Sequence, residues 1–154
     1  MTQSHPSFSA VMHLLRAHAR LEERFAAELG AVHGLALKEA LLLMHLETSP
    51  RARLSRVDLA KRLSTSPSTV TRMTAPLEKL GLVGREADAR DARLAYVVLT
   101  DAGREAVGNA RATLDKLSAE VFRDRWSKPE IAQLAEFLSR LTAGLPGDLV
   151  ARAA

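Results

Sequence analysis

The spacing of apolar residues changes once along this chain, and that change limits the folds that it can form. Over most of the sequence apolar residues recur at steps of three and four, which places them on one face of an α-helix. Between residues 82 and 100 the step becomes two, as in a half-buried β-strand, and the polar stretch ADARDAR divides this segment. The sequence therefore predicts a mainly α fold with one small β-hairpin, formed by residues 82–86 and 94–100.

Three of the predicted helices differ in how their apolar residues are arranged. The helix at residues 8–32 carries an apolar stripe that is long for one small domain, and a second copy of the chain is the simplest partner for it. The helix at 37–46 is apolar nearly all round and should lie buried. The last, at 127–144, is expected to turn one face inward and to be followed by a frayed tail, LPGDLVARAA. That face consists of Ile131, Leu134, Leu138 and Leu141.

Side-chain oxygens mark where several helices begin. Ser55, with Asp58 three residues later, is typical of an N-cap and opens a short helix ending near residue 63. Ser127 and Glu130 resemble a capping box. A helix at 101–121 follows the hairpin, with apolar residues in line over about six turns.

The helix that begins at Ser66 is the most informative segment. Pro67 takes its first position, where a missing N–H costs nothing. Pro76 should kink or loosen it, and Gly81 should end it. One face is predicted to be buried: Val70, Met73, Leu77 and Leu80. Small hydroxyls and one arginine are left to point away from the core.

Length and composition exclude several classes of protein. A chain of 154 residues can bury one core and is too short for two independent domains. It has no cysteine, which rules out disulfides, zinc ribbons and thiol sensors. The sequence shows no signal peptide and no apolar run of membrane-spanning length, so we expect no membrane association and a cytoplasmic location.

The positive charge is concentrated in the middle of the chain. The net charge is +4, but residues 51–104 hold 11 Lys and Arg against 6 Asp and Glu, whereas the rest of the chain is near neutral. A cluster this mild is often just a solvated surface. It is also what contact with nucleic-acid phosphates needs.

Two short helices joined by a tight turn, followed by a hairpin with arginines at its tip, form a winged helix-turn-helix. The second of these helices enters the DNA major groove by its N-terminal residues, where hydroxyls allow close approach and an arginine can reach a guanine edge. The candidate DNA-binding residues are therefore Ser66, Ser68, Thr69, Thr71 and Arg72, with Arg72 the candidate for base recognition.

Three stretches in order, DLAKRLSTSPSTVTRM, PLEKLGLVGR and READARDARLAYVVLTDAG, make the chain resemble the MarR family of bacterial transcription regulators over nearly its whole length. The resemblance implies a single domain, residues 1–154, in which helices within 8–34 and 102–144 form a homodimer. Residues 37–100 would be the winged DNA-binding part. Two such parts would reach successive major grooves of a pseudo-palindromic operator in double-stranded DNA, about 34 Å apart.

The resemblance also assigns roles in the wing and in a pocket. In the wing, Asp91 and Arg93 match an aspartate-x-arginine pair whose arginine reaches the minor groove, with Arg90 at the tip and Ala92 where arginine is frequent. The chain would be a repressor released by a small aromatic or phenolic effector bound between the dimer helices and the winged part. The candidate pocket residues are Arg16, His18, Arg20 and His45.

Other functions have less support in the sequence. No catalytic constellation, metal-ligand spacing or phosphate-binding loop appears, so we expect neither an enzyme nor a cofactor. Two alternatives remain: a winged helix that docks on proteins, and a non-specific DNA-binding protein that responds to no effector. A protein-docking helix would expose aromatic or aliphatic anchors, whereas residues 65–72 are rich in hydroxyls and basic.

Overall fold

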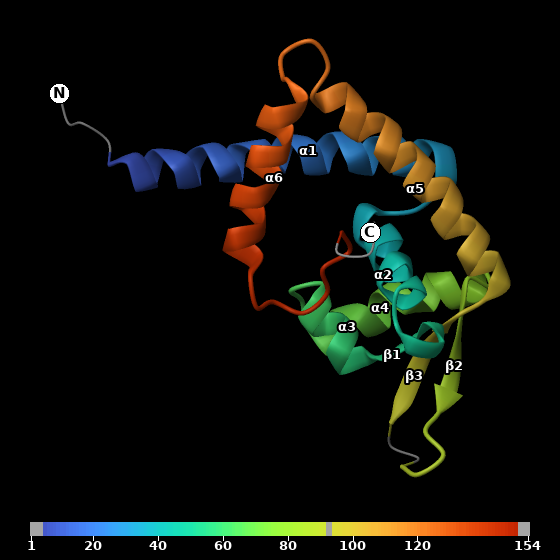
Figure 1. The fold of residues 1–154 in the computed structure, drawn as a ribbon. Coiled ribbons are helices and arrows are strands. Elements are labelled where there is room, and N and C mark those ends of the chain that lie inside the picture. The colour runs from blue at the N-terminus through green and yellow to red at the C-terminus, as the bar shows by residue number, and fades with distance from the viewer. Residues whose placement is uncertain (1–4, 92–93, 151–154) are drawn as a thin grey trace.

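The computed structural model describes residues 5–91 and 94–150, and Figure 1 shows how their helices and strands are arranged. The long helix α1 (Pro6–His33) is followed by α2 (Leu37–Glu47), a short 3-10 turn (Pro50–Ala52) and strand β1 (Arg53–Ser55). The remaining elements are α3 (Arg56–Arg62), α4 (Pro67–Lys79), β2 (Val83–Ala87), β3 (Ala95–Leu99), α5 (Asp101–Val121) and α6 (Lys128–Thr142). The mainly helical prediction is confirmed.

The predicted helix caps are present. The Ser55 hydroxyl accepts a hydrogen bond from the Asp58 N–H at 3.1 Å, and Ser66 accepts one from the Thr69 N–H at 3.2 Å. Ser127 and Glu130 form a complete capping box at the start of α6. At the end of α4, Gly81 has a φ of 72°, the left-handed conformation that glycine adopts without strain.

The sheet has three strands, one more than predicted. They lie in the order β1-β3-β2, and both pairings are antiparallel, with Val83 opposite Leu99 and Leu54 opposite Val97. The hairpin of β2 and β3 is confirmed. Strand β1 was not predicted, because its three residues, which end at the predicted N-cap Ser55, are too few to show an alternating pattern.

The core lies where α2 meets α4, the sheet and the C-terminal part of α1. Leu42, Leu43 and Leu46 of α2 are completely buried, as its all-round apolar sequence predicted. In α4, Val70 and Leu77 are buried, but Leu80 is 63% exposed, so its predicted place in the core is wrong. Leu80 is the C-cap, where the helix ends.

Helix α4 runs without interruption from Pro67 to Lys79, with Pro76 inside it. The buried polar residue of this helix is Thr74, whose hydroxyl donates to the Thr71 carbonyl at 3.1 Å. A hydroxyl satisfied in this way can be buried without an unpaired polar group.

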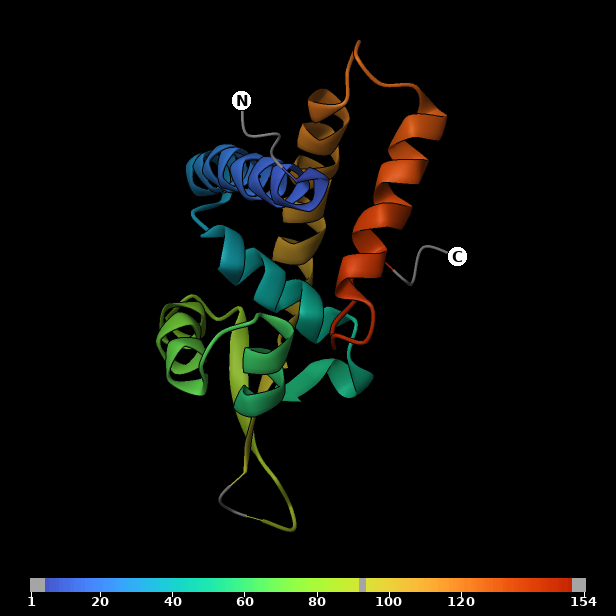
Figure 2. The ribbon, with the colours of Figure 1, turned by 90° about the vertical axis from the view of Figure 1, so that its left-hand side faces the viewer.

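Helices α1 and α6 leave most of their apolar residues uncovered. The N-terminal half of α1 extends past the rest of the molecule in Figure 1, and α6 leads from the loop after α5 back toward the winged part (Figures 1 and 2). None of the described side chains of α6 is buried, and Leu141 is 67% exposed. The prediction that the apolar face of α6 is buried inward is therefore wrong for the single chain, in which α1 and α5 cover this face only in part.

The tail after α6 turns back onto the winged part, so the prediction of a frayed tail is wrong for residues 145–150. Leu149 packs against the core. A Cβ added to Gly147 would lie 2.8 Å from Arg62 Cγ and 3.0 Å from His45 Cε1, so the tail passes close over both residues. The left-handed backbone of Gly147, with a φ of 93°, also requires glycine.

Candidate nucleic-acid interface

The exposed N-terminal end of α4 gathers three hydroxyl groups, those of Ser66, Ser68 and Thr69. Ser66 Oγ lies 2.9 Å from both Ser68 Oγ and Thr69 Oγ1, in addition to capping the helix. Pro67 at the first position has no N–H to satisfy and its ring fixes a helical φ. The N-terminal end of a helix also carries a partial positive charge, so this group of hydroxyls suits a phosphate or the edge of a base.

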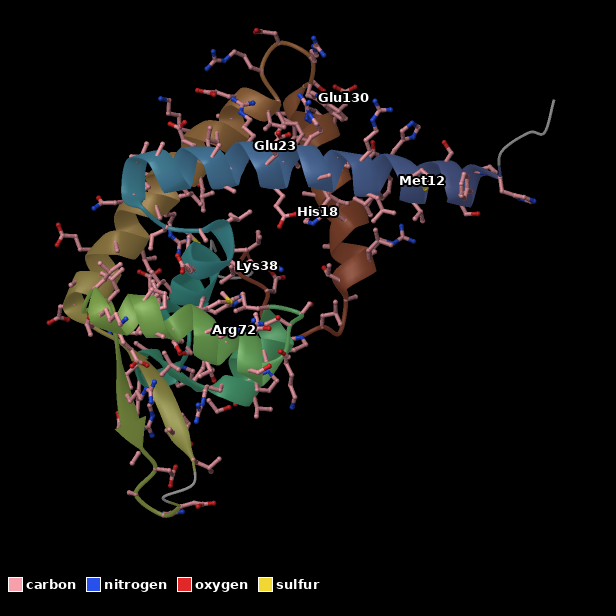
Figure 3. The ribbon with its side chains drawn as sticks, turned by 180° about the vertical axis from the view of Figure 1, so that it is seen from behind. Met12, His18, Glu23, Lys38, Arg72 and Glu130 are labelled. Carbon is pink, nitrogen blue, oxygen red and sulfur yellow. The ribbon has the colours of Figure 1, made fainter. Side chains whose placement is uncertain are left out.

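Arg72 is exposed one turn further along, and its Nη2 donates to Thr69 Oγ1 at 3.3 Å. Figure 3 shows Arg72 on the outer side of α4, with the hairpin projecting below. A long guanidinium held loosely by a hydroxyl can turn outward to a ligand at little cost.

Thr71 is tied into the protein, unlike its neighbours. Its hydroxyl donates to the Pro67 carbonyl at 3.1 Å and accepts a hydrogen bond from Arg56 Nη1 at 3.3 Å. The sequence analysis missed Arg56, because a bond between residues 15 apart on two helices has no signal in the spacing of either. Arg56 thus joins the start of α3 to the exposed side of α4.

The wing tip is organised by an aspartate that the sequence analysis missed. Asp88 Oδ1 accepts the backbone N–H of Arg90 at 2.7 Å and that of Asp91 at 3.2 Å, and Asp88 Oδ2 accepts the Tyr96 hydroxyl at 3.1 Å. These hydrogen bonds hold the pKa of the Asp88 carboxyl below its usual range, and the bond from the Arg90 N–H contributes most. Arg93, the predicted minor-groove residue, and Ala92 lie outside the described residues.

The wing is also joined to its neighbours by ion pairs. Arg85 Nε of β2 lies 2.7 Å from Glu78 Oε1 of α4. Arg53 of β1 pairs with Glu86 of β2, and its guanidinium carbon lies 4.5 Å from the centre of the Tyr96 ring. Helix α4 and the wing are therefore directly connected through Arg85 and Glu78.

The structure does not bring the four candidate pocket residues together. Arg16 and His18 lie on the exposed part of α1, where His18 Nε2 is 3.6 Å from Glu22 Oε2. Arg20 borders an apolar groove of about 610 Å³ between α1, α5 and α6. His45 is only 4% exposed, in α2. Its burial, with Arg62 close by, lowers the pKa of its imidazole to about 4.

A different groove lies between α1, α2 and α4. It measures about 450 Å³, and its lining includes Glu22, Lys38, Thr69 and Met73. Figure 3 shows Lys38 and His18 in the region between α1 and α4. The sequence analysis missed Lys38, which precedes the buried face of α2 and has no motif around it.

The described residues form neither a metal site nor a membrane span made of one helix. They contain no group of three His, Cys, Asp or Glu side chains placed to hold a metal ion. No single helix in the described part is long and apolar enough to cross a membrane. Helices α1 and α2 pass that test only as a pair, bent by 78°.

The fold and this surface define a winged helix-turn-helix protein, and comparison with known proteins identifies its family. The model of the MarR family matches residues 35–94. Two uncharacterised HTH-type transcriptional regulators of Bacillus subtilis are similar. YhbI is 30% identical over 71% of both chains, and YdgJ is 31% identical over 57% of this chain but only 53% of its own length. The chain belongs to the MarR family of transcription regulators, which are not enzymes.

Solved structures agree over almost the whole chain. Sco3205, a MarR family regulator from Streptomyces coelicolor crystallised in complex with DNA, has a TM-score of 0.80 and 26% identity, covering 97% of this chain and 96% of its own. BpsR of Bordetella bronchiseptica, whose DNA binding is regulated by 6-hydroxynicotinic acid, shares the fold, with a TM-score of 0.77 at 21% identity over 92% and 98% of the two chains. The winged part and the flanking helices thus occur together in these proteins.

Proposed function

We propose that this protein is a dimeric, sequence-specific DNA-binding regulator. The observation that carries the proposal is the exposed N-terminal half of α4, where hydroxyls and Arg72 point away from a well-packed core beside a wing that carries Arg90 at its tip. A surface of this kind suits the major groove. It lacks the apolar anchors that a protein-docking helix would expose.

The hydrogen bonds that each side chain makes within the protein suggest which part of the DNA it contacts. Arg72 reads a base edge, and Ser68 and Thr69 contact a phosphate or base beside it. Ser66 and Thr71 approach the DNA less freely, because one caps the helix and the other is bonded to Pro67 and Arg56. Arg90 at the wing tip, with Arg93, reaches the minor groove, where a guanidinium is attracted by the negative potential.

Dimerisation is supported by apolar surface that the single chain leaves uncovered. On α1, Phe8 is 62% and Leu15 56% exposed. Trp126, in the loop after α5, and Leu141 of α6 are also exposed. Large apolar patches of this kind mark an interface. A second copy of the chain, placed with two-fold symmetry, would cover α1 and α6 and direct the two α4 helices toward successive major grooves.

We further propose that a small aromatic or phenolic anion releases this repressor from its operator. The groove between α1 and α4 supports this proposal, because Lys38, which lies there with Glu22 and Glu39, can pair with a carboxylate, and because Thr69 of α4 borders it. A ligand there would change the position of α4 relative to the dimer helices. BpsR shows that a protein of this fold can respond to an aromatic acid.

The test of DNA recognition is selection from random duplexes, followed by fluorescence anisotropy on the selected and a scrambled duplex over a salt series. Tight binding to the selected duplex, with weak and steeply salt-dependent binding to the scrambled one, is expected. Equal binding to both would favour the non-specific alternative. An absence of binding would favour the protein-docking alternative.

The effector proposal has a separate test. Aromatic carboxylates and phenols are titrated against the protein–operator complex, with wild type and with Lys38→Met. Release of wild type by a carboxylate, and a weaker response of Lys38→Met that binds the operator equally well, are expected. Operator affinity unchanged by every compound would count against effector release.

A further inference from the structure

The described residues of the wing tip, 88–91 and 94, are joined by a network of hydrogen bonds centred on Asp88. Besides the two N–H groups held by Asp88 Oδ1, the Asp88 N–H donates to the Leu94 carbonyl and the Leu94 N–H donates to the Asp91 carbonyl, both at 2.9 Å. Asp88 therefore closes the turn on both sides. The turn has no buried side chain to support it, since the described residues from Ala89 to Asp91 are exposed.

Asp88 is itself held by a tyrosine that reaches up from the sheet. Tyr96 of β3 lies opposite Glu86 of β2 and Ser55 of β1, and its hydroxyl donates to Asp88 Oδ2. Arg53 stacks on the Tyr96 ring at 4.5 Å and pairs with Glu86. A guanidinium over an aromatic face is attractive, and this one also fixes the ring between two strands.

We propose that Tyr96 and Asp88 are positioning residues for DNA binding, with Arg53 fixing the Tyr96 ring, so that the wing tip presents Arg90 in one orientation before DNA arrives. We call these three residues the wing brace. This inference rests on the proposed function, because it explains how the wing serves DNA contact. A tip that is already ordered loses less conformational entropy on binding, so the complex is tighter.

The chain's single tyrosine makes the brace visible by spectroscopy. The hydrogen bond to Asp88 and the charge of that carboxylate raise the pKa of Tyr96, Asp58 adds to the effect, and Arg53 opposes it. Asp88→Asn keeps an oxygen acceptor but removes the charge. Ultraviolet titration of the tyrosine should therefore give a lower pKa in Asp88→Asn than in wild type. Identical titration curves would overturn the brace.

The functional test removes one hydroxyl. Tyr96→Phe keeps the ring under Arg53, and we expect it to bind the selected operator about two- to tenfold more weakly than wild type. Thr48→Val is the matched control: it removes a hydroxyl whose hydrogen bond, to the His45 carbonyl at 3.3 Å, lies at the C-cap of α2. It should bind like wild type.

A double-mutant cycle shows whether the brace acts through the tip. In an Arg90→Ala background, Tyr96→Phe should cost much less affinity than it does alone. The same cost in both backgrounds, or wild-type affinity for Tyr96→Phe, would overturn the proposal. If wild type itself prefers no duplex after selection, the proposed function fails. If wild type is specific and Tyr96→Phe matches it, only the brace fails.

Discussion

At the scale of single residues, Arg72 carries the largest expected effect on DNA recognition. It is exposed and contacts Thr69, so its removal should leave the fold intact. We expect Arg72→Ala to weaken binding to the selected operator by about 1 to 3 kcal/mol and binding to random DNA only slightly. Anisotropy on the two duplexes measures this. Lys79→Ala, at the exposed far end of the same helix, is the control. Equal weakening on both duplexes would mean that Arg72 holds a phosphate.

His45 should make the protein sensitive to acid. Its Nδ1 is buried without a hydrogen-bond partner among the described residues, and burial lowers the pKa from 6.5 to about 4. Between those values the unfolded chain binds a proton that the folded chain does not, so the free energy of unfolding falls as the pH falls. From pH 6.5 to 4, wild type should lose about 3 kcal/mol more than His45→Leu. Urea unfolding at several pH values measures this, and parallel pH profiles for the two proteins would contradict it.

At the scale of elements, features that depend on residues close in sequence were predicted correctly, whereas contacts between distant segments were not. The caps at Ser55, Ser66 and Ser127 and the β2–β3 hairpin depend on residues a few positions apart, and the sequence showed them. Strand β1 exists because Arg53–Ser55 pairs with β3, far along the chain. The Tyr96–Asp88 and Arg56–Thr71 bonds likewise join separate elements, so only the hydroxyl face of α4 and the tip arginines could be found beforehand.

The exposed apolar faces of α1 and α6 show what helical periodicity can and cannot predict. Their apolar spacing correctly identified helices, but it could not say which molecule covers them. For Ile131, Leu134, Leu138 and Leu141, "inward" assumed a core within one chain. The periodicity of a helix indicates that a face is covered, and the partner has to come from elsewhere.

Gly103 lets the first turn of α5 lie close to the backbone of Leu82 and the side chain of Leu99. A Cβ on Gly103 would lie 2.1 Å from the Leu82 carbonyl oxygen, a backbone atom, and 2.6 Å from Leu99 Cδ1. Gly108, in the same helix, has nothing within 4 Å of such an atom. We expect Gly103→Ala to destabilise the fold by about 1 to 3 kcal/mol or more, because α5 must move. Gly108→Ala should stabilise it by about 0.5 to 1 kcal/mol. Thermal unfolding compares them, and equal effects would refute the packing described.

At the scale of the whole molecule, the uncovered faces should hold two chains together. Leu15 of α1 and Val57 of α3 are exposed to similar extents, 56% and 51%. A charge at the dimer interface would be desolvated, so Leu15→Glu should shift the protein toward monomer. Val57→Glu, outside the proposed interface, should not. Sedimentation over a range of protein concentrations distinguishes them, and a Leu15→Glu dimer as stable as wild type would place the interface elsewhere.

The central claim is that two copies of α4 read one operator together, and its most direct test is the spacing of the half-sites. Affinity is measured for the selected operator and for the same operator with about five base pairs inserted at its centre, which turns one half-site about half a helical turn away from the other. Near loss of specific binding on the lengthened duplex is predicted, because a dimer fixed by α1 and α6 cannot reach both grooves. Unchanged affinity would contradict the claim and show that each winged part reads DNA on its own.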